Sequence, residues 1–191
     1  MIYAFLANGF EDIEALAPVD ILRRAGVEVT TVSINPTREV ESSHGITVLA
    51  DVTFADLAVA ADGGIADADM LFLPGGLPGA TNLFEHQGLI AALRAQAAAD
   101  KFIAAICAAP FILGEMGLLE GKKATCYPGF EEHFNGGCYT ADVVTVAGKI
   151  LTGEGPGAAM ELGYTMLEQL GLGEASAQLR EGMRYNHLLA K

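Results

Sequence analysis

Short apolar runs alternate along the chain with longer segments in which apolar residues recur at helical spacing. Short apolar or β-branched runs bounded by glycine, proline or polar residues are typical of buried strands. Four such runs predict strands at residues 2–7, 27–32, 70–73 and 102–106. A shorter strand is expected at residues 46–49, and a hairpin at 143–146 and 149–152. Helical periodicity predicts helices at residues 11–25, 89–99, 110–116 and 156–170.

This alternation predicts an α/β fold, with a doubly wound, mostly parallel sheet, helices on both faces and a small β-hairpin. The 191 residues contain no internal repeat and no linker, so we expect one domain over residues 1–191. In such sheets, ligands bind beyond the carboxyl ends of the strands. The turns after Ala7, Leu73 and Ile106 are therefore the places where a site is expected.

The charge balance narrows the range of partners. With 11 basic and 24 acidic residues, the formal net charge is −13, and such a surface repels phosphate backbones and anionic lipids. We therefore expect neither nucleic acid nor a membrane as a partner, and no basic leader precedes the first strand. An odd count of three cysteines, without close spacing, favours neither disulfides nor a metal site. We expect a cytoplasmic protein with reduced thiols.

The most informative local pattern is Ala104-Ala105-Ile106-Cys107-Ala108-Ala109-Pro110. A buried strand ends, a cysteine follows and a helix begins almost at once, which is the layout of a nucleophile elbow. Small residues two positions before and after Cys107 allow the tight turn. The N–H groups at the start of a helix favour a thiolate, so we expect a lowered pKa for this thiol. The alternative is an inert cysteine in a turn of small residues.

One acidic side chain is expected on the buried face of the first helix. The apolar positions of segment 11–25 form a single stripe when they are placed at about 100° per residue: Ile13, Leu16, Ala17, Ile21 and Ala25. Glu14 falls on this side and Glu11 points away, while Asp20 is expected to be a buried hydrogen-bonding acid. A buried carboxyl should have a raised pKa and could exchange a proton with a thiol. The alternative for Glu14 is an acid at the rim of the core or one that answers the helix dipole.

Paired glycines follow another buried strand in Leu73-Pro74-Gly75-Gly76. Because Gly75 and Gly76 lack side chains, their backbone N–H groups can approach a ligand, and with the amide of Ala108 they could form an oxyanion hole. A tight turn without a ligand is the alternative. No G-x-G-x-x-G or phosphate-loop motif is present, and no cofactor is expected.

Two further side chains could reach the same site. Tyr127 follows a short strand that ends at Cys126, and it could overhang the mouth of the site. A packing aromatic fits this pattern equally well. His44 lies in the loop after the second strand and is the one histidine worth following, with an ordinary surface histidine as the alternative.

Taken together, these motifs resemble the ThiJ/PfpI superfamily, and more closely its branch of the parkinsonism-associated deglycase. The matching segments follow the family's order over nearly the whole chain: Gly9-Phe10-Glu11-Asp12-Ile13-Glu14, Pro18-Val19-Asp20, Arg23-Arg24-Ala25-Gly26, Leu73-Pro74-Gly75-Gly76, Ala104-Ala105-Ile106-Cys107-Ala108, Asn135-Gly136-Gly137, Leu151-Thr152 and Gly155-Pro156-Gly157. The resemblance implies a flavodoxin-like fold and a homodimer. It casts Cys107 as the nucleophile and oxidation-prone thiol, and Glu14 as its protonated hydrogen-bond partner. The backbones of Gly76 and Ala108 would hold an oxyanion.

The chain departs from the family pattern near the expected site. Several family members carry a histidine just after the strand that ends here at Cys126, whereas this chain has Tyr127. A phenol with a pKa of about 10 donates hydrogen bonds but is a poor base at neutral pH, which puts a mechanism needing that histidine in doubt. The family's arginine near the mouth is replaced by His44. No histidine directly follows Cys107, as one does in the peptidase branch, so proteolysis is not expected.

The residues and the resemblance together favour a cysteine-dependent, cofactor-free enzyme. Its substrate would be a small α-oxoaldehyde or an adduct of one, so the activity would be glyoxalase-like or deglycase-like. Cys107 would add to the carbonyl and Glu14 would move protons. The first alternative is a redox-responsive stress or chaperone-like protein that senses oxidation at Cys107. Thiamine-precursor (thiazole phosphate) metabolism and amidotransferase-like hydrolysis are further alternatives.

Overall fold

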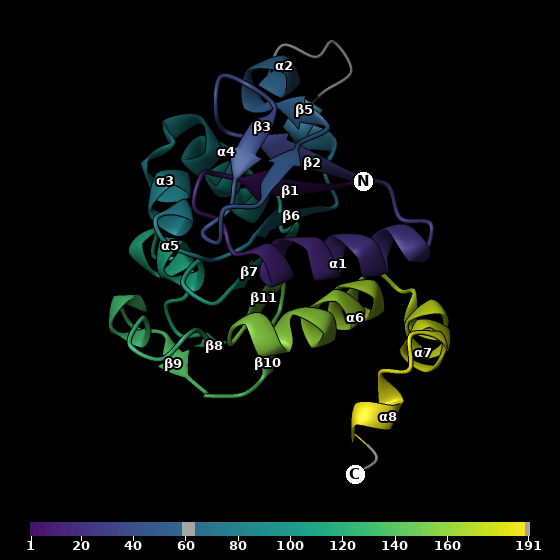
Figure 1. Ribbon diagram of the computed structural model, residues 1–191. Helices are drawn as coiled ribbons and strands as arrows, with labels where there is room; N and C mark the ends of the chain where they lie inside the picture. Colours follow the sequence, from purple (N-terminus) through teal and green to yellow (C-terminus); the bar gives the residue numbers. More distant parts are fainter. Residues whose placement is uncertain (59–63, 190–191) are drawn as a thin grey trace.

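A seven-stranded sheet forms the centre of the protein (Figure 1), in a computed structural model that describes residues 1–58 and 64–189. The strand order is β10-β11-β7-β6-β1-β2-β5. Neighbouring strands are parallel except for β10 and β11, which form an antiparallel hairpin. The strands of this sheet are β1 Ile2–Leu6, β2 Val29–Ser33, β5 Val52–Thr53, β6 Met70–Leu73, β7 Phe102–Ile106, β10 Val144–Ala147 and β11 Ile150–Gly153.

Two small ladders lie outside the main sheet. Strands β3 (Glu39–Glu41) and β4 (Thr47–Leu49) pair antiparallel, and β8 (Lys123–Ala124) pairs parallel with β9 (Cys138–Tyr139). The short strand expected at residues 46–49 is therefore present as β4, but it belongs to this separate ladder.

Helices cover both faces of the sheet, as Figure 1 shows. Helices α1 (Asp12–Arg24) and α6 (Ala159–Gln169) pack against each other on one face. The opposite face carries α3 (Gly79–Glu85), α4 (Gln87–Ala98) and α5 (Pro110–Glu115). The remaining helical segments are α2 Phe54–Ala58, α7 Gly173–Gly182, α8 Asn186–Leu189, and the 3-10 turns η1 Gly64–Asp67, η2 Glu131–His133 and η3 Pro156–Ala158.

The apolar strands explain why both faces are covered. Successive side chains of a strand point to opposite faces, so Ile2 and Ala4 of β1 enter one apolar cluster while Tyr3 and Phe5 enter the other. Because both sets are buried, each needs a layer of helices over it. The predicted doubly wound α/β fold with its small hairpin is confirmed.

The buried face of α1 differs from the predicted stripe. Ile13 and Leu16 are exposed, and Asp20 is exposed in an ion pair with Arg24, so these three predictions are wrong. Ile21 of the predicted stripe is buried. The buried residues of α1 are Asp12, Glu14, Ala15, Pro18, Val19, Ile21 and Leu22. Apolar periodicity alone does not distinguish a face that packs inside the chain from one left on its surface.

The start of α1 also differs from the prediction. The side chain of Glu11 does not point away but caps the helix, accepting a hydrogen bond from the backbone N–H of Glu14 at 2.7 Å. Capping satisfies one of the N–H groups that a helix leaves free at its start, and it fixes the first turn of α1 beside the sheet.

Across residues 1–58 and 64–189, no helix combines the length and the apolar composition that crossing a membrane requires.

Candidate active site

Cys107 occupies a sharp turn between β7 and α5. Its backbone has φ of +63°, which is rare for a residue with a side chain. The Cys107 N–H donates to the carbonyl of Gly153 at 2.9 Å, and the Cys107 carbonyl accepts from the N–H of Tyr127 at 2.8 Å. These two hydrogen bonds hold the turn between β11 and the segment after β8. The expected elbow geometry is therefore present around this partly exposed cysteine.

Glu14 is fully buried and reaches Cys107 from the first turn of α1. The Gly75 N–H donates to Glu14 Oε2 at 3.0 Å, and the Glu14 carboxyl is a hydrogen-bond partner of the Cys107 thiol. Glu14 Oε1 is buried and has no partner among the residues that the structure describes. An unpartnered buried oxygen is far more costly on a carboxylate than on a neutral acid, so this arrangement favours protonated Glu14.

The electrostatics of Glu14 agree with that geometry. Burial raises the pKa of Glu14 to about 7, against an ordinary value of 4.5, although its hydrogen bond with Cys107 lowers it. The charge of nearby Glu11 raises the pKa of Glu14 further, and the Gly75 amide lowers it. A group with a pKa near neutrality can both give and take a proton, as general acid–base catalysis requires.

The thiol of Cys107 behaves differently from the sequence-based expectation. Burial raises the pKa of Cys107, and the charge of ionised Glu14 and its hydrogen bond raise it further, while the N–H groups of Gly76 and Ala108 lower it. The expected lowering of the pKa is wrong because burial of the sulfur and the acidic partner beside it outweigh the backbone N–H groups. A thiolate at Cys107 therefore depends on Glu14 holding the proton, so that the pair carries one negative charge.

The two glycines, Gly75 and Gly76, have different roles. A Cβ atom on Gly75 would lie 2.6 Å from Glu14 Oε2 and 2.7 Å from Cys107 Cβ, so only glycine fits between these side chains. Because the Gly75 N–H already bonds Glu14, it is not free to hold an oxyanion. The backbone N–H groups of Gly76 and Ala108 instead hydrogen-bond the sulfur.

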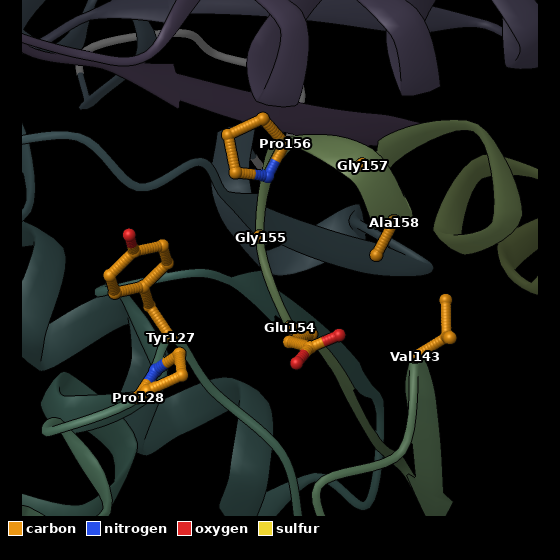
Figure 2. A pocket seen from close by; sticks show the side chains of 8 residues that line it. All are labelled: Tyr127, Pro128, Val143, Glu154, Gly155, Pro156, Gly157 and Ala158. Atoms are coloured by element: carbon orange, nitrogen blue, oxygen red, sulfur yellow. The ribbon is translucent and has the colours of Figure 1, made fainter.

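Tyr127 forms one wall of a pocket beside this turn. Its side chain is 50% exposed, and its ring lies against the backbone of Gly155. The pocket has a volume of about 480 Å³. Figure 2 shows Tyr127 on one side of it, Val143 on the other and Glu154 between them. The sequence pattern suggested that Tyr127 could overhang the site, but nothing in it indicated Glu154. The pocket is formed by segments that lie far apart in the chain.

His44 does not lie with the cysteine but at the surface beside the first turn of α1. Its exposed imidazole pairs with Asp12 in the first turn of α1, with Nδ1 2.6 Å from Asp12 Oδ2. Glu11, Asp12 and His44 each offer one ligand atom within 4.8 Å of the others, so a metal ion could fit between them. The ion pair and the helix cap already account for the positions of these three side chains.

Comparison with known proteins adds independent information. The model of the DJ-1/PfpI family matches residues 1–169. "Protein DJ-1 homolog B" of Arabidopsis thaliana is 42% identical over 177 residues, which cover 90% of this chain and 38% of the relative. The chain thus spans about two fifths of the length of this plant protein and of its homolog A.

A solved structure and a more distant relative bear on the chemistry. The structure titled "Toxoplasma gondii DJ-1, oxidized" has a TM-score of 0.88 and 34% identity, covering 95% of this chain and 96% of that one. The "Glutathione-independent glyoxalase DJR-1.2" of Caenorhabditis elegans is 28% identical over 162 residues, covering 84% of this chain and 82% of the relative.

Proposed function

The chain belongs to the DJ-1/PfpI family, and from this premise we propose that it is a cysteine-dependent, cofactor-free enzyme for small α-oxoaldehydes or their adducts. The observation that carries this proposal is the contact between partly exposed Cys107 and buried Glu14, in which the pKa of Glu14 is raised to about 7. A nucleophile beside a group that gives and takes protons near neutral pH is the minimum such chemistry needs. The glyoxalase named among the relatives supports the same substrate class.

The reaction converts a ketoaldehyde and water into a hydroxy acid without an external oxidant. The sulfur of Cys107 adds to the aldehyde carbon, and the N–H groups of Gly76 and Ala108 stabilise the oxygen that becomes negative. Glu14 passes the proton of the thiol to that oxygen and is left ionised. It then takes the hydrogen of that carbon as a proton, the first oxygen gives its proton to the second through an enediol, and Glu14 returns its proton to the neighbouring carbon. The first carbon is thereby oxidised to a thioester while the second is reduced to an alcohol. Water then releases the hydroxy acid and restores the thiol.

The test is lactate formation from methylglyoxal without glutathione, by the wild type and Cys107→Ala side by side. We expect lactate from the wild type and none above the uncatalysed rate from the variant, because no other group takes the place of the sulfur. Activity retained in Cys107→Ala would overturn the mechanism. Lactate from the wild type would also show that Tyr127 is compatible with the reaction.

A second function is favoured by the same sulfur and by the oxidised relative. Two molecules of peroxide would convert the thiol of Cys107 to a sulfinic acid and leave two molecules of water, with protonated Glu14 stabilising the product. After mild peroxide treatment, we expect mass spectrometry to find two added oxygens at Cys107 before any at exposed Cys138. Equal oxidation of Cys107 and Cys138 would contradict a sensing role.

We also propose a homodimer as the assembled form. Exposed apolar side chains gather on α1 and on the hairpin of β3 and β4, and the ion pair between His44 and Asp12 holds these two segments together. The exposed apolar side chains are those of Ile13, Leu16, Ile46 and Leu49. Covering such side chains is what a second copy would achieve, and light scattering should give twice the mass of one chain.

A further inference from the structure

The pocket beside Cys107 is larger than a small oxoaldehyde needs. Its volume of about 480 Å³ falls in the range of sites that bury drug-sized ligands. Two of its lining residues are held close to the backbone of the cysteine. The backbone N–H of Tyr127 donates to the Cys107 carbonyl, and Glu154 directly follows Gly153, whose carbonyl accepts from the Cys107 N–H. The pocket therefore adjoins the turn of Cys107, and a substrate attached to the sulfur could extend into it.

The lining of the pocket has a simple chemistry. Apart from the aromatic ring of Tyr127, the side chains with apolar surface are Pro128, Val143, Pro156 and Ala158. Glu154 is the one charged side chain among the described residues that line it, and it is partly buried.

The carboxylate of Glu154 also has no hydrogen-bond or ion-pair partner among the described residues. Its backbone N–H donates to the carbonyl of Val143 at 3.0 Å, which fixes the residue in the pocket wall. Within the described parts of the chain, no hydrogen bond or ion pair reaches its side-chain oxygens. A carboxylate held between apolar groups and an aromatic ring is a site for an organic cation, because the ring face attracts positive charge as well.

We infer that this pocket selects α-oxoaldehyde substrates in which an apolar stem carries a cationic group, such as a quaternary ammonium or a guanidinium. Glu154 is the specificity-determining residue, and Tyr127 supplies the aromatic wall. This inference rests on the proposed function, which supplies the α-oxoaldehyde group of the substrate. Substrates with an anionic group, glutathione adducts included, are disfavoured by Glu154 and by the net charge of −13.

The test compares three arylglyoxals that carry a neutral, a cationic or an anionic para position: phenylglyoxal, its 4-trimethylammonio derivative and its 4-carboxy derivative. The quaternary ammonium cannot condense with the aldehyde. For the wild type we expect kcat/KM to fall from the cationic through the neutral to the anionic substrate. In Glu154→Gln, the ratio between cationic and anionic substrates should fall by about fivefold or more, mainly through KM, as a partly exposed ion pair allows.

Two control variants separate the pocket from general charge effects. Glu154→Asp keeps the carboxylate and should keep the order of the three substrates. Glu28→Gln removes the same charge at an exposed position before β2, at the opposite end of the strands, and should leave the ratio as in the wild type. An unchanged ratio in Glu154→Gln, or the same fall in Glu28→Gln, would overturn the inference.

A binding measurement separates this inference from the proposed reaction. Calorimetric titration with phenyltrimethylammonium and with benzoate needs no turnover. Preferred binding of the cation that is lost in Glu154→Gln supports the pocket assignment even if no glyoxal is consumed, in which case only the proposed reaction fails. Turnover of all three glyoxals without any charge preference, in rates or in binding, leaves the reaction standing and removes the assignment.

Discussion

The partly exposed thiol of Cys107 and the buried thiol of Cys126 make an instructive comparison. Burial raises the pKa of both Cys107 and Cys126, the latter to about 12, and both sulfurs accept backbone hydrogen bonds. Cys126 accepts from Phe130 and lies wholly inside the apolar cluster on the face of α4 and α5. Cys107 packs against the cluster of the opposite face and is partly exposed.

What separates them is the partner for the proton. Cys107 lies at a strained turn beside the carboxyl of Glu14, whose pKa is about 7. The charge that raises the pKa of Cys126 comes from Glu131, which makes no side-chain hydrogen bond to that sulfur. Burial and backbone donors are common to both thiols, so neither can be what makes one of them reactive. The comparison teaches that a proton-sharing partner within contact of the sulfur is the distinguishing feature.

The largest expected difference is between the two alanine variants. Cys107→Ala should lose lactate formation completely, whereas Cys126→Ala should keep it within about threefold because its sulfur only fills the core. Removing that buried sulfur should lower the free energy of unfolding by about 1–2 kcal/mol. The checks are the methylglyoxal assay and urea unfolding of each variant. A folded Cys126→Ala protein without activity would mean that the two thiols do not differ as proposed.

The next variant, Glu14→Gln, tests whether the carboxyl of Glu14 is the group that exchanges protons at Cys107. The amide keeps the shape of the carboxyl but cannot shuttle a proton, so we expect the rate of lactate formation to fall by about 10²- to 10⁴-fold. Because the pKa of Glu14 is about 7, we also expect the rate of the wild type to change near pH 7 and this change to be absent from the variant.

Asp20→Asn provides the matched control for that variant. It also removes one carboxylate from α1, but at an exposed position whose ion pair with Arg24 contributes little. A loss in Asp20→Asn as large as that in Glu14→Gln would indicate a general effect on the helix.

The part of this picture that the sequence predicted is local. Strands 70–73 and 102–106 have the predicted bounds because wholly apolar runs end abruptly at Pro74 and at Cys107. The elbow needs only short-range information, since small residues on both sides of Cys107 are visible in the sequence. Glu14 was expected on the buried face and lies there.

What the sequence could not predict depends on distant contacts. Within the predicted stripe, Ile21 is buried but Ile13 and Leu16 are exposed, because periodicity does not say what will cover a helix. The direction of the Cys107 pKa shift depends first on how deeply the sulfur is buried and then on the nearby carboxyl of Glu14, and packing between α1 and the sheet sets both. Glu154 and Tyr127 meet only because β11 and the segment after β8 flank the same turn.

The last expected difference is a pH dependence of stability that belongs to Glu14 and has no counterpart at Cys126. The pKa of Glu14 is about 7 in the folded protein, against an ordinary value of 4.5 that we take for the unfolded chain. Between these pH values the folded state binds more protons, so the free energy of unfolding falls as the pH rises. The full contribution is present below pH 4.5 and is lost through pH 7, and it amounts to about 3 kcal/mol.

Comparing wild type with Glu14→Gln by urea unfolding isolates this contribution from carboxyls such as Asp51, whose pKa is lowered and which titrate the other way. Near pH 5 the two proteins should be similar, because a neutral acid and an amide have nearly the same shape and charge. At pH 8 the variant should be the more stable one, because the wild type must then ionise a carboxyl with an unpartnered oxygen in the core. For Cys126→Ala, the difference from wild type should stay constant over the same range. A constant difference for Glu14→Gln would instead mean that its carboxyl does not hold the proton on which the thiolate of Cys107 depends.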